Sequence, residues 1–486
     1  MRAKSDILAR MPFGPDYRPS PVFLELGCGY AEIVEPARFP QHILRFRNQI
    51  WAERVGLGSL TDEEWRAHMA EFKPLPGNLE KHYALSYHGH QFRVYNPDLG
   101  DGRGFLYAQL RDKDGRILDL GTKGSGQTPY SRGGDGRLTL KGGVREILAT
   151  EMLESLGVNT SKSFSLFETG EKLIRHDEPS PTRSSVLVRL SHSHIRFGTF
   201  QRLAVFRDEA RMRKLLDYCL RHYFASLGEV VPEDQPAVFL KEVVHRSARL
   251  CASWMIAGFV HGVLNTDNMN ITGESFDYGP YRFLPKYDPG FTAAYFDETG
   301  LYSYGRQPEA VMWNLERLAA ALLLVSNESA LAPQLQEFVP AFNEAILELL
   351  TERLGLISLD ADRDEDLLLA TFRFLEESQV PFEQFFHDWY GGVLSHERAM
   401  KSPVASAYQG DAFENWRKIL QMYKASAAAV ERLEDPYFRR LTPCALLIDE
   451  IESIWDAIDT RDDWSKFEEK IVDIRQMGKV YGRRTV

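Results

Sequence analysis

The chain has 486 residues, of which 44% are hydrophobic and 12% aromatic, so it can bury a large core and form two or three structural units. Its formal net charge of −11 argues against a broad nucleic-acid or anionic-membrane surface. The longest apolar stretch, Leu318–Val325, is far shorter than the roughly 20 residues of a membrane span. The four cysteines have no metal-ligand spacing and the first residues, MRAKSDILARMPFG, contain no apolar signal core, so we expect a cytoplasmic protein.

The residues before about Pro76 are mixed and rich in proline, with one short helical pattern in residues 42–57 that Gly56 and Gly58 end. Earlier still, FLELGCGYAE (23–32) resembles the Gly-rich turn of nucleotide-dependent methyltransferases. Pro36 and Pro40 interrupt the helix that should follow this turn. A methyltransferase site therefore remains only as an alternative.

Three strand patterns follow, at 91–95, 105–110 and 116–123, and Asp114-Gly115 favours a hairpin between the last two. Residues 144–157 predict an amphipathic helix that ends at Gly157, and residues 184–197 again predict a strand. From about Asp208 onward helical periodicity dominates, as in 311–325 and 446–458. The acidic run 359–369 is interpreted as the solvated start of a helix. Together these patterns predict an α+β protein that begins with an antiparallel sheet and continues mostly as helices.

The stretch HGVLNTDNMNITGESFDYGPY (261–281) follows part of a kinase-type catalytic loop pattern, His-x-Asp-x-x-x-x-Asn and then Asp-x-Gly. Asn268 and Asp277 stand at the two magnesium-ligand positions, and their oxygen atoms are of the ligand type that Mg²⁺ selects. A cap at Asn268 and a turn at Asp277 would explain the same two residues without a metal. The base position of the pattern holds Val263.

Asp267 stands directly before Asn268, and neighbouring side chains in an extended loop point in different directions. Asn268 can therefore face a metal ion while Asp267 faces an incoming hydroxyl group and serves as the missing general base. A positioned base contributes roughly 10²–10⁴ in rate, so a displaced base position does not imply an inactive enzyme. An Asx turn made by the Asp267 side chain is the other reading of this residue.

Lys123 ends a predicted strand, and Glu146 lies on the helical face that also carries Ala149 and Leu153. A carboxylate on such a face needs a cation, and an ion pair with Lys123 would supply it and direct the ammonium group at a phosphate. Either charge alone is more simply explained as a surface residue.

Two Gly-rich loops, 99–104 and 123–137, each contain Gly-Asp-Gly-Arg, which combines flexible backbone with a guanidinium suited to phosphate. Arg189 and Arg196 flank SHSHI in an apolar strand pattern and require an anionic partner. A triphosphate would satisfy Arg189, and so would a buried Arg–Asp pair.

With these residues the chain resembles the selenoprotein O family, also called YdiU-like, of pseudokinase-fold protein adenylyltransferases. The resemblance extends over roughly Tyr83 to Leu315, and HGVLNTDNM with DYGPY is highly specific to the family. Its motifs here are YHGHQF (87–92), LGDGR (99–103), KGSGQTPYSRGGDGR (123–137), VREIL (144–148), SHIRFGTF (193–200), GFVHGVLNTDNMNITGESFDYGPY (258–281), YDPGF (287–291) and QPEAVMWNL (307–315).

The resemblance implies a two-lobed, protein-kinase-like fold with a small antiparallel N-lobe sheet and a mostly helical C-lobe. The expected parts are an N-terminal extension (1–80), an N-lobe (81–205), a C-lobe with the catalytic loop (206–400) and a C-terminal helical region (401–486). ATP would bind in a flipped orientation, and AMP would pass to Ser, Thr or Tyr hydroxyls of proteins.

By motif, the expected nucleotide contacts are Gly100, Gly102, Arg103, Lys123, Asp135, Gly136, Arg189, Arg196 and Asp277. Asn268 and Asp277 would bind Mg²⁺, with Mn²⁺ as the alternative ion, Glu146 would pair with Lys123, and Asp267 would accept the proton. The implied partners are protein substrates, with self-modification included, and neither nucleic acid nor membrane.

The chain departs from the family pattern in places. Typical members have RSSIRE where this chain has KGGVRE, so Gly142 and Gly143 are expected to loosen the start of the Glu146 helix. Many members carry a cysteine or selenocysteine near the C-terminus, whereas the last cysteine here is Cys444, which argues against a terminal redox role. Two alternative functions remain at this stage: an ordinary γ-phosphotransferase and a non-catalytic nucleotide-binding scaffold.

Overall fold

The computed structural model describes residues 13–176 and 178–483. By their contacts, these residues form two compact units. Unit 1 comprises the described residues of 1–86, 98–143 and 162–194, and unit 2 those of 87–97, 144–161 and 195–486. The observed elements confirm the α+β prediction, with an antiparallel sheet and many helices. The first twelve residues, which entered the localisation prediction, lie outside the described part of the chain.

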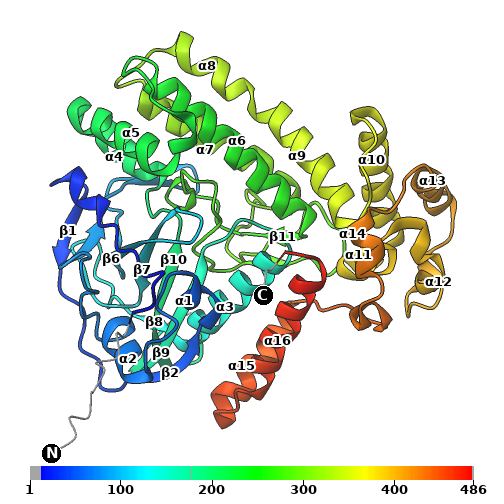
Figure 1. The fold of residues 1–486 in the computed structure, drawn as a ribbon, viewed down its shortest axis with the longest axis horizontal. Helices are drawn as coiled ribbons and strands as arrows, with labels where there is room; N and C mark the ends of the chain where they lie inside the picture. Colours follow the sequence, from blue (N-terminus) through cyan, green and yellow to red (C-terminus); the bar gives the residue numbers. More distant parts are fainter. Residues whose placement is uncertain (1–12, 177, 484–486) are drawn as a thin grey trace, which may run out of the picture. The chain divides into compact units, whose positions relative to one another are not determined.

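Unit 1 is built on one antiparallel sheet, visible in blue to cyan in Figure 1. The strand order is β1-β3-β6-β7-β10-β9-β2, and β8 pairs with β10. The first 80 residues thus supply both edge strands of the sheet. The strands are β1 (Ala31–Val34), β2 (Ile43–Arg47), β3 (His82–Leu85), β6 (Leu106–Arg111), β7 (Ile117–Lys123), β8 (Leu138–Thr139), β9 (Lys162–Leu173) and β10 (Thr182–Ser191).

The core of unit 1 lies between this sheet and two short helices, α1 (Gln49–Arg54) and α2 (Asp62–Met69). Trp51 and Trp65 project from the helices into a cluster that contains Phe164 and Phe167 of β9. The Trp65 indole N–H donates to Ser165 Oγ at 2.9 Å, so the buried indole keeps a hydrogen-bond partner. This aromatic packing makes the sheet rigid, so the loops at its strand ends begin from fixed positions.

One local prediction for unit 1 is confirmed and two others are not, or only in part. Strands β6 and β7 pair as an antiparallel hairpin, and Gly115 in the connecting turn has a φ of 80°. The methyltransferase alternative is wrong, because Val22–Leu26 forms a 3-10 helix and Ala31–Val34 a strand where a strand and then a helix were needed. Of the helix predicted in residues 42–57, the second part is confirmed by α1, whereas Ile43–Arg47 is the edge strand β2.

Two predicted strands also differ in the structure. Residues 91–95 are not one strand, because the chain reverses at Phe92 and Arg93 between β4 (Gly89–Gln91) and β5 (Val94–Asn96). The strand predicted at 184–197 ends at Ser191, and a helix begins at Phe197.

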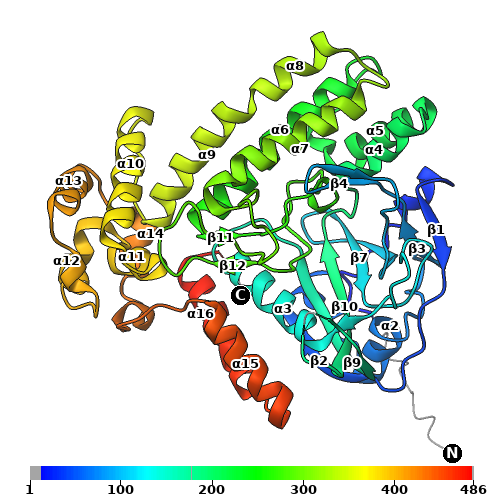
Figure 2. The same ribbon diagram turned by 180° about the vertical axis from the view of Figure 1, so that it is seen from behind.

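Unit 2 is mostly helical. Helix α6 contacts α7, α8 and α9, and Figure 2 shows these four helices next to one another. The helices are α4 (Phe197–Val205), α5 (Glu209–Tyr223), α6 (Gln235–Ile256), α7 (Gln307–Leu322), α8 (Glu328–Gln336), α9 (Phe338–Arg353), α10 (Ala361–Ser378), α11 (Phe382–Trp389), α12 (His396–Ala399), α13 (Asp411–Leu420), α14 (Ala427–Arg432), α15 (Ile448–Arg461) and α16 (Ser465–Val480).

The helix predicted at 144–157 is α3 (Leu140–Ser155), whose residues from Val144 onward belong to unit 2. Helix α3 already includes Gly142 and Gly143, so these glycines lie within its first turn instead of loosening its start. Gly157 follows the end of the helix with a φ of 86°. The helices predicted at 311–325 and 446–458 are confirmed by α7 and α15. At the acidic run 359–369, Asp360 is the N-cap residue of α10.

Within unit 2, the C-terminal helix α16 packs against α3 and forms an ion pair with it. Arg475 donates from Nε and Nη2 to the two carboxylate oxygens of Glu151 at 2.8 and 2.9 Å. Gly478 faces Ser155, where a Cβ atom would lie 2.7 Å from the serine Oγ. Across residues 13–176 and 178–483, no helix combines the length and the apolar character that crossing a membrane requires.

Candidate active site

The loop that carries the predicted catalytic residues is closed by two short paired strands of unit 2, β11 (Phe259–Val260) and β12 (Arg282–Phe283). Phe259 pairs with Phe283, so both ends of the intervening segment are fixed at one place. A single 3-10 turn, η3 (Thr266–Asn268), lies within it. The segment therefore holds Asp267, Asn268 and Asp277 in one loop system, as the sequence pattern predicts.

Arg196 connects the two parts of this loop. Its Nη1 donates to the Asp267 carbonyl oxygen at 3.1 Å and lies 3.9 Å from Asp277 Oδ2. The guanidinium is buried between aromatic rings, 4.4 Å from the ring centre of Tyr87 and 4.9 Å from that of Phe276. Since these rings restrict the guanidinium, it holds the Asp267 backbone and the Asp277 carboxylate at a fixed spacing.

Asn268 is oriented by the residue that replaces the kinase base. Its side-chain Nδ2 donates to the Val263 carbonyl oxygen at 3.0 Å, which leaves the Oδ1 atom as the acceptor end of the amide. Its backbone N–H donates to the Asn265 carbonyl oxygen at 3.0 Å. Val263 therefore contributes a backbone acceptor to the loop in place of a carboxylate.

Asp277 has a φ of 66°, in the left-handed region that aspartate tolerates better than most residues, and its side chain is 25% exposed. One amide oxygen and one carboxylate are hard oxygen donors, and Mg²⁺ takes its other ligands from water and phosphate. The donor chemistry of Asn268 and Asp277 therefore fits a magnesium ion that is shared with a nucleotide. Within the described residues no group of three or more His, Cys, Asp or Glu could hold a metal.

Helix α3 is attached to the Asp277 loop next to Glu146, whose side chain is fully buried. Arg145 Nη2 donates to the carbonyl oxygens of Gly279 and Tyr281 at 3.3 Å, and the Tyr281 hydroxyl donates to the Arg145 carbonyl at 2.8 Å. Burial raises the pKa of Tyr281 to about 12, the positive charges of Arg145 and Arg282 act in the opposite direction, and the negative charge of Glu146 adds a smaller increase.

The positions of Lys123 and Arg189 in unit 1 follow from the pairing of β7 with β10. Gly121 pairs with Arg189, and Lys123 pairs with Leu187. Directly paired residues share a sheet face, and so do residues two apart on a strand, so Lys123 and Arg189 lie on the same face. Both are largely buried. Lys123 and Glu146 belong to different units, and their ion pair stays a prediction.

The two Gly-rich loops of unit 1 pack against each other. The backbone N–H of Gly124 donates to the Arg103 carbonyl oxygen at 2.7 Å, and the N–H of Gly126 donates to the Gly136 carbonyl at 3.1 Å. A Cβ atom on Gly136 would lie 2.2 Å from the Gly126 carbonyl group, and one on Gly102 would lie 2.7 Å from the Tyr130 carbonyl oxygen. The structure thus brings together the segments that carry Gly100, Gly102, Arg103, Asp135 and Gly136.

Asp135 forms an ion pair with Arg175, whose Nη1 and Nη2 donate to Oδ2 and Oδ1 at 2.8 and 3.1 Å. Partial burial alone would raise the pKa of Asp135, but the bonds from Arg175 and from the Arg137 backbone N–H outweigh it and lower the pKa. The carboxylate is therefore ionised at neutral pH and oriented toward Arg175.

His261 is the histidine of the loop pattern, and Gln307 and Asn314 lie in the motif 307–315, but the sequence interpretation gave these three residues no role in supporting the loop. His261 Nε2 is hydrogen-bonded to the Phe276 carbonyl at 3.0 Å, and its backbone N–H donates to Gln307 Oε1 at 3.0 Å. Asn314 Nδ2 donates to the Leu264 carbonyl at 2.8 Å. Gln307 and Asn314 are seven residues apart on α7, so they share a helical face, and two buried amides on an apolar face were the signal that could have identified them.

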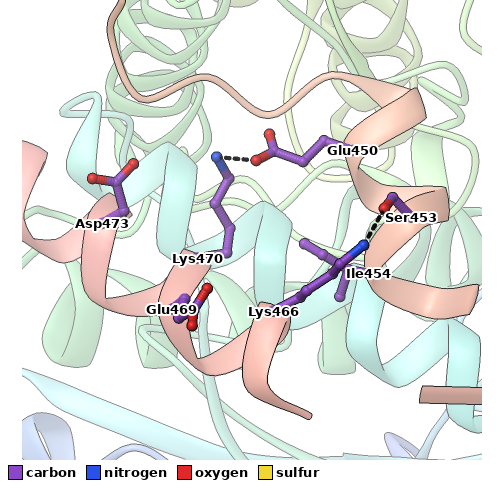
Figure 3. A pocket seen from close by; sticks show the side chains of 7 residues that line it. All are labelled: Glu450, Ser453, Ile454, Lys466, Glu469, Lys470 and Asp473. Carbon is purple, nitrogen blue, oxygen red and sulfur yellow. Dashed lines mark hydrogen bonds and ion pairs between the residues drawn. The ribbon is translucent and has the colours of Figure 1, made fainter. Parts of the chain in front are cut away.

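A pocket of about 410 Å³ lies between α15 and α16 (Figure 3). Its two lysines are engaged, because Lys470 Nζ lies 2.6 Å from Glu450 Oε1 and Lys466 Nζ donates to Ser453 Oγ at 2.8 Å. Glu469 and Asp473 add further negative charge. Its three carboxylates outnumber its two lysines, so the lining does not favour a triphosphate.

Comparisons with known proteins are consistent in pointing to one family. A family model described as "Protein adenylyltransferase SelO" matches residues 16–475. Among similar proteins is the "Protein nucleotidyltransferase YdiU" of Trichormus variabilis, 45% identical over 478 residues that cover 94% of this chain and 96% of the relative. Proteins of the same name from Gloeobacter violaceus (46% over 467 residues, 95% of each chain) and Trichodesmium erythraeum (45% over 461 residues, 92% and 96%) are also similar.

Proposed function

Because the chain belongs to the SelO family of protein adenylyltransferases and is a nucleotidyltransferase, we propose that it transfers AMP from ATP to Ser, Thr or Tyr hydroxyl groups of proteins. In this proposal ATP binds in a flipped orientation, so that its α-phosphate and not its γ-phosphate meets the acceptor. The products are an AMP-modified hydroxyl and pyrophosphate. Self-modification would follow the same chemistry on the enzyme's own hydroxyl groups.

The observation that carries the proposal is the position of Arg196. One guanidinium hydrogen-bonds to the Asp267 carbonyl and lies 3.9 Å from the Asp277 carboxylate, so the proposed base and the proposed metal ligand are held together in unit 2. The support is that one buried cation contacts both the backbone of the proposed base and the carboxylate of the proposed metal ligand.

In the proposed mechanism Asp267 accepts the proton of the acceptor hydroxyl as its oxygen attacks the α-phosphorus, and pyrophosphate leaves with the electrons of the broken P–O bond. Asn268 and Asp277 would hold Mg²⁺, with Mn²⁺ as the alternative, and the bound ion would supply charge neutralisation for the phosphates. Lys123, Arg189 and Arg103 would orient the triphosphate, and the backbone N–H groups at Gly100, Gly102 and Gly136 would approach its oxygens. Asp135 and Arg196 complete the proposed nucleotide contacts.

The proposal extends to the architecture. Residues 81–205 would serve as the nucleotide-binding lobe and residues 206–400 as the catalytic lobe of a two-lobed, kinase-like fold, with Glu146 paired to Lys123 as in kinases. The four-part division at residues 80, 205 and 400 belongs to the same proposal. So do a cytoplasmic setting and the absence of nucleic-acid and membrane partners.

The test is incubation of the enzyme and a protein acceptor with Mg²⁺ and ATP that is labelled at either the α- or the γ-phosphate. The proposal predicts stable label on protein from α-labelled ATP only. Retention from γ-labelled ATP alone would establish a conventional kinase, and no retention from either, with ATP binding intact, would establish a scaffold. Asp277→Ala is the matched control, because loss of the metal ligand should abolish labelling.

A further inference from the structure

The hairpin β4–β5 of unit 2 turns through two residues whose backbones are strained. Phe92 has a φ of 49° and Arg93 a φ of 64°, both in the left-handed region. Two-residue hairpin turns of this conformation ordinarily contain Asn-Gly or Asp-Gly, since other side chains meet the backbone there. A residue in this conformation persists only where surrounding contacts hold it. The turn is therefore maintained by the contacts that it makes elsewhere.

Those contacts are made with the two residues that precede Asp267. The backbone N–H of His90 donates to Thr266 Oγ1 at 2.7 Å, and the backbone N–H of Phe92 donates to Asn265 Oδ1 at 3.0 Å. Both acceptors are buried. The strained hairpin therefore holds the chain directly before Asp267 by two hydrogen bonds from backbone groups, which cannot rotate away as side chains do.

The Thr266 hydroxyl is fixed from a second direction. It donates to Gln201 Oε1 of α4 at 2.7 Å, so it accepts from the hairpin and donates to the helix at the same time. Gln201 Nε2 lies 2.8 Å from His90 Nδ1, which closes a ring of three bonds through His90, Thr266 and Gln201. Burial and then the charge of Arg317 lower the pKa of His90, in keeping with a neutral ring that accepts at Nδ1.

Asn265 is fixed in the same manner. Its Oδ1 atom accepts the Tyr302 hydroxyl at 2.9 Å in addition to the Phe92 N–H. The ring of Tyr302 contacts the ring of Phe92, with 5.1 Å between centres. Burial raises the pKa of Tyr302, and the negative charge of Asp267 raises it further.

We propose that Asn265 and Thr266 are positioning residues for Asp267, held by the β4–β5 hairpin, Gln201 and Tyr302. The inference rests on the proposed function, in which Asp267 accepts the proton of the acceptor hydroxyl. A base must lie within hydrogen-bond reach of the proton that it removes, and a displacement of about 1 Å can cost about 10²-fold in rate. Arg196 holds the carbonyl group of Asp267 itself. The hairpin holds the two residues directly before Asp267, so the backbone is fixed both at the base and ahead of it.

The test is Thr266→Val, which keeps the shape of the side chain and removes both hydroxyl bonds. We expect kcat for AMP transfer to fall about tenfold to a hundredfold, with the KM for ATP within about twofold of wild type, because the nucleotide contacts are untouched. Thr266→Ser restores the hydroxyl and should recover most of the rate. Thr272→Val is the matched control, because Thr272 is a buried threonine of the same loop whose hydroxyl bonds to Asn270 instead of the hairpin network.

Tyr302→Phe provides a second test should Thr266→Val fail to fold. It removes one of the two bonds to Asn265, so we expect a smaller fall in kcat with an unchanged KM for ATP. Wild-type kcat in both Thr266→Val and Tyr302→Phe would overturn the inference, as would a loss in Thr266→Val that Thr266→Ser does not recover. A wild-type enzyme that transfers no AMP at all would instead overturn the proposed function, and the positioning role with it.

Discussion

At the residue scale, the predictions of the metal ligands and of the base depend on a loop pattern that is local in the sequence. Asp267, Asn268 and Asp277 lie within one short stretch, so chemistry and spacing sufficed to select them. Arg196 was expected only as a nucleotide contact, and its bond to the Asp267 carbonyl could not be foreseen. That bond depends on how a segment 71 residues earlier in the chain folds back, which no local pattern encodes.

Replacing Asp267 tests whether its carboxylate acts as the general base. Asp267→Asn keeps the size of the side chain and removes its basicity, so the variant should fold, bind Mg·ATP and lose about 10²-fold or more in turnover. Asp277→Asn should instead weaken Mg·ATP binding itself, because it removes the charged metal ligand. Titration calorimetry and steady-state turnover separate the two effects, and full turnover in Asp267→Asn would exclude Asp267 from the mechanism.

At the element scale, the sequence predicted those elements whose pattern is long or marked by a turn residue. Helices α3, α7 and α15 have sustained periodicity, and the β6–β7 hairpin has Asp114-Gly115. The β4–β5 turn was missed because Phe92-Arg93 carries no turn signature and is held by contacts with residues 265 and 266. Strand β2 was missed because its pairing with β9, about 120 residues later, overrides a helical-looking local pattern.

The Gly-rich loops give a prediction at this scale. Gly136 and Gly133 both have positive φ, 68° and 80°, so alanine is strained at either site. Only at Gly136 would the added Cβ collide with backbone, whereas nothing lies within 4 Å at Gly133. Gly136→Ala should therefore displace the loop and weaken ATP binding by about tenfold or more, equivalent to about 1.4 kcal/mol, with Gly133→Ala much closer to wild type.

Titration calorimetry with ATP and Mg²⁺ measures the difference between these two variants. Equal affinities would show that backbone packing between residues 126 and 136 does not shape the nucleotide site. Thermal unfolding of both variants serves as the control for general damage.

At the scale of the whole molecule, the sequence predicted the α+β class but not how the chain alternates between its units. Residues 87–97 and 144–161 belong to unit 2, although the segments on both sides of 87–97 belong to unit 1. Such alternation depends on tertiary contacts, including the bonds of residues 90 and 92 to Thr266 and Asn265, and not on composition. A division of the sequence into consecutive domains could not reveal this alternation between the two units.

Buried tyrosines in both units predict how stability changes with pH. Burial raises the pKa of Tyr281 to about 12 from an ordinary value of 10.0, and it also raises the pKa of Tyr107 and Tyr278. The folded state therefore favours the neutral phenol. The resulting contribution to the free energy of unfolding is fully present below the unfolded pKa of 10.0 and is lost as the pH rises toward about 12. The urea midpoint should fall above pH 10 together with the appearance of tyrosinate absorbance.

The control for this prediction is Tyr281→Phe, which removes one of the titrating groups. Its stability should be lower near neutral pH, because the hydroxyl bond to the Arg145 carbonyl is lost, but should decline less steeply in alkali. A urea midpoint that stays constant while all tyrosines ionise would contradict the account.

The central claim is that this enzyme moves AMP, and not phosphate, onto protein hydroxyl groups. Intact-mass spectrometry of the protein and its acceptor after incubation with Mg·ATP measures this most directly, because the mass added identifies the group transferred. The account predicts additions of single AMP units in the wild type that are strongly reduced in Asp267→Asn. Additions of phosphate, or an unchanged mass under conditions in which ATP is bound, would contradict it.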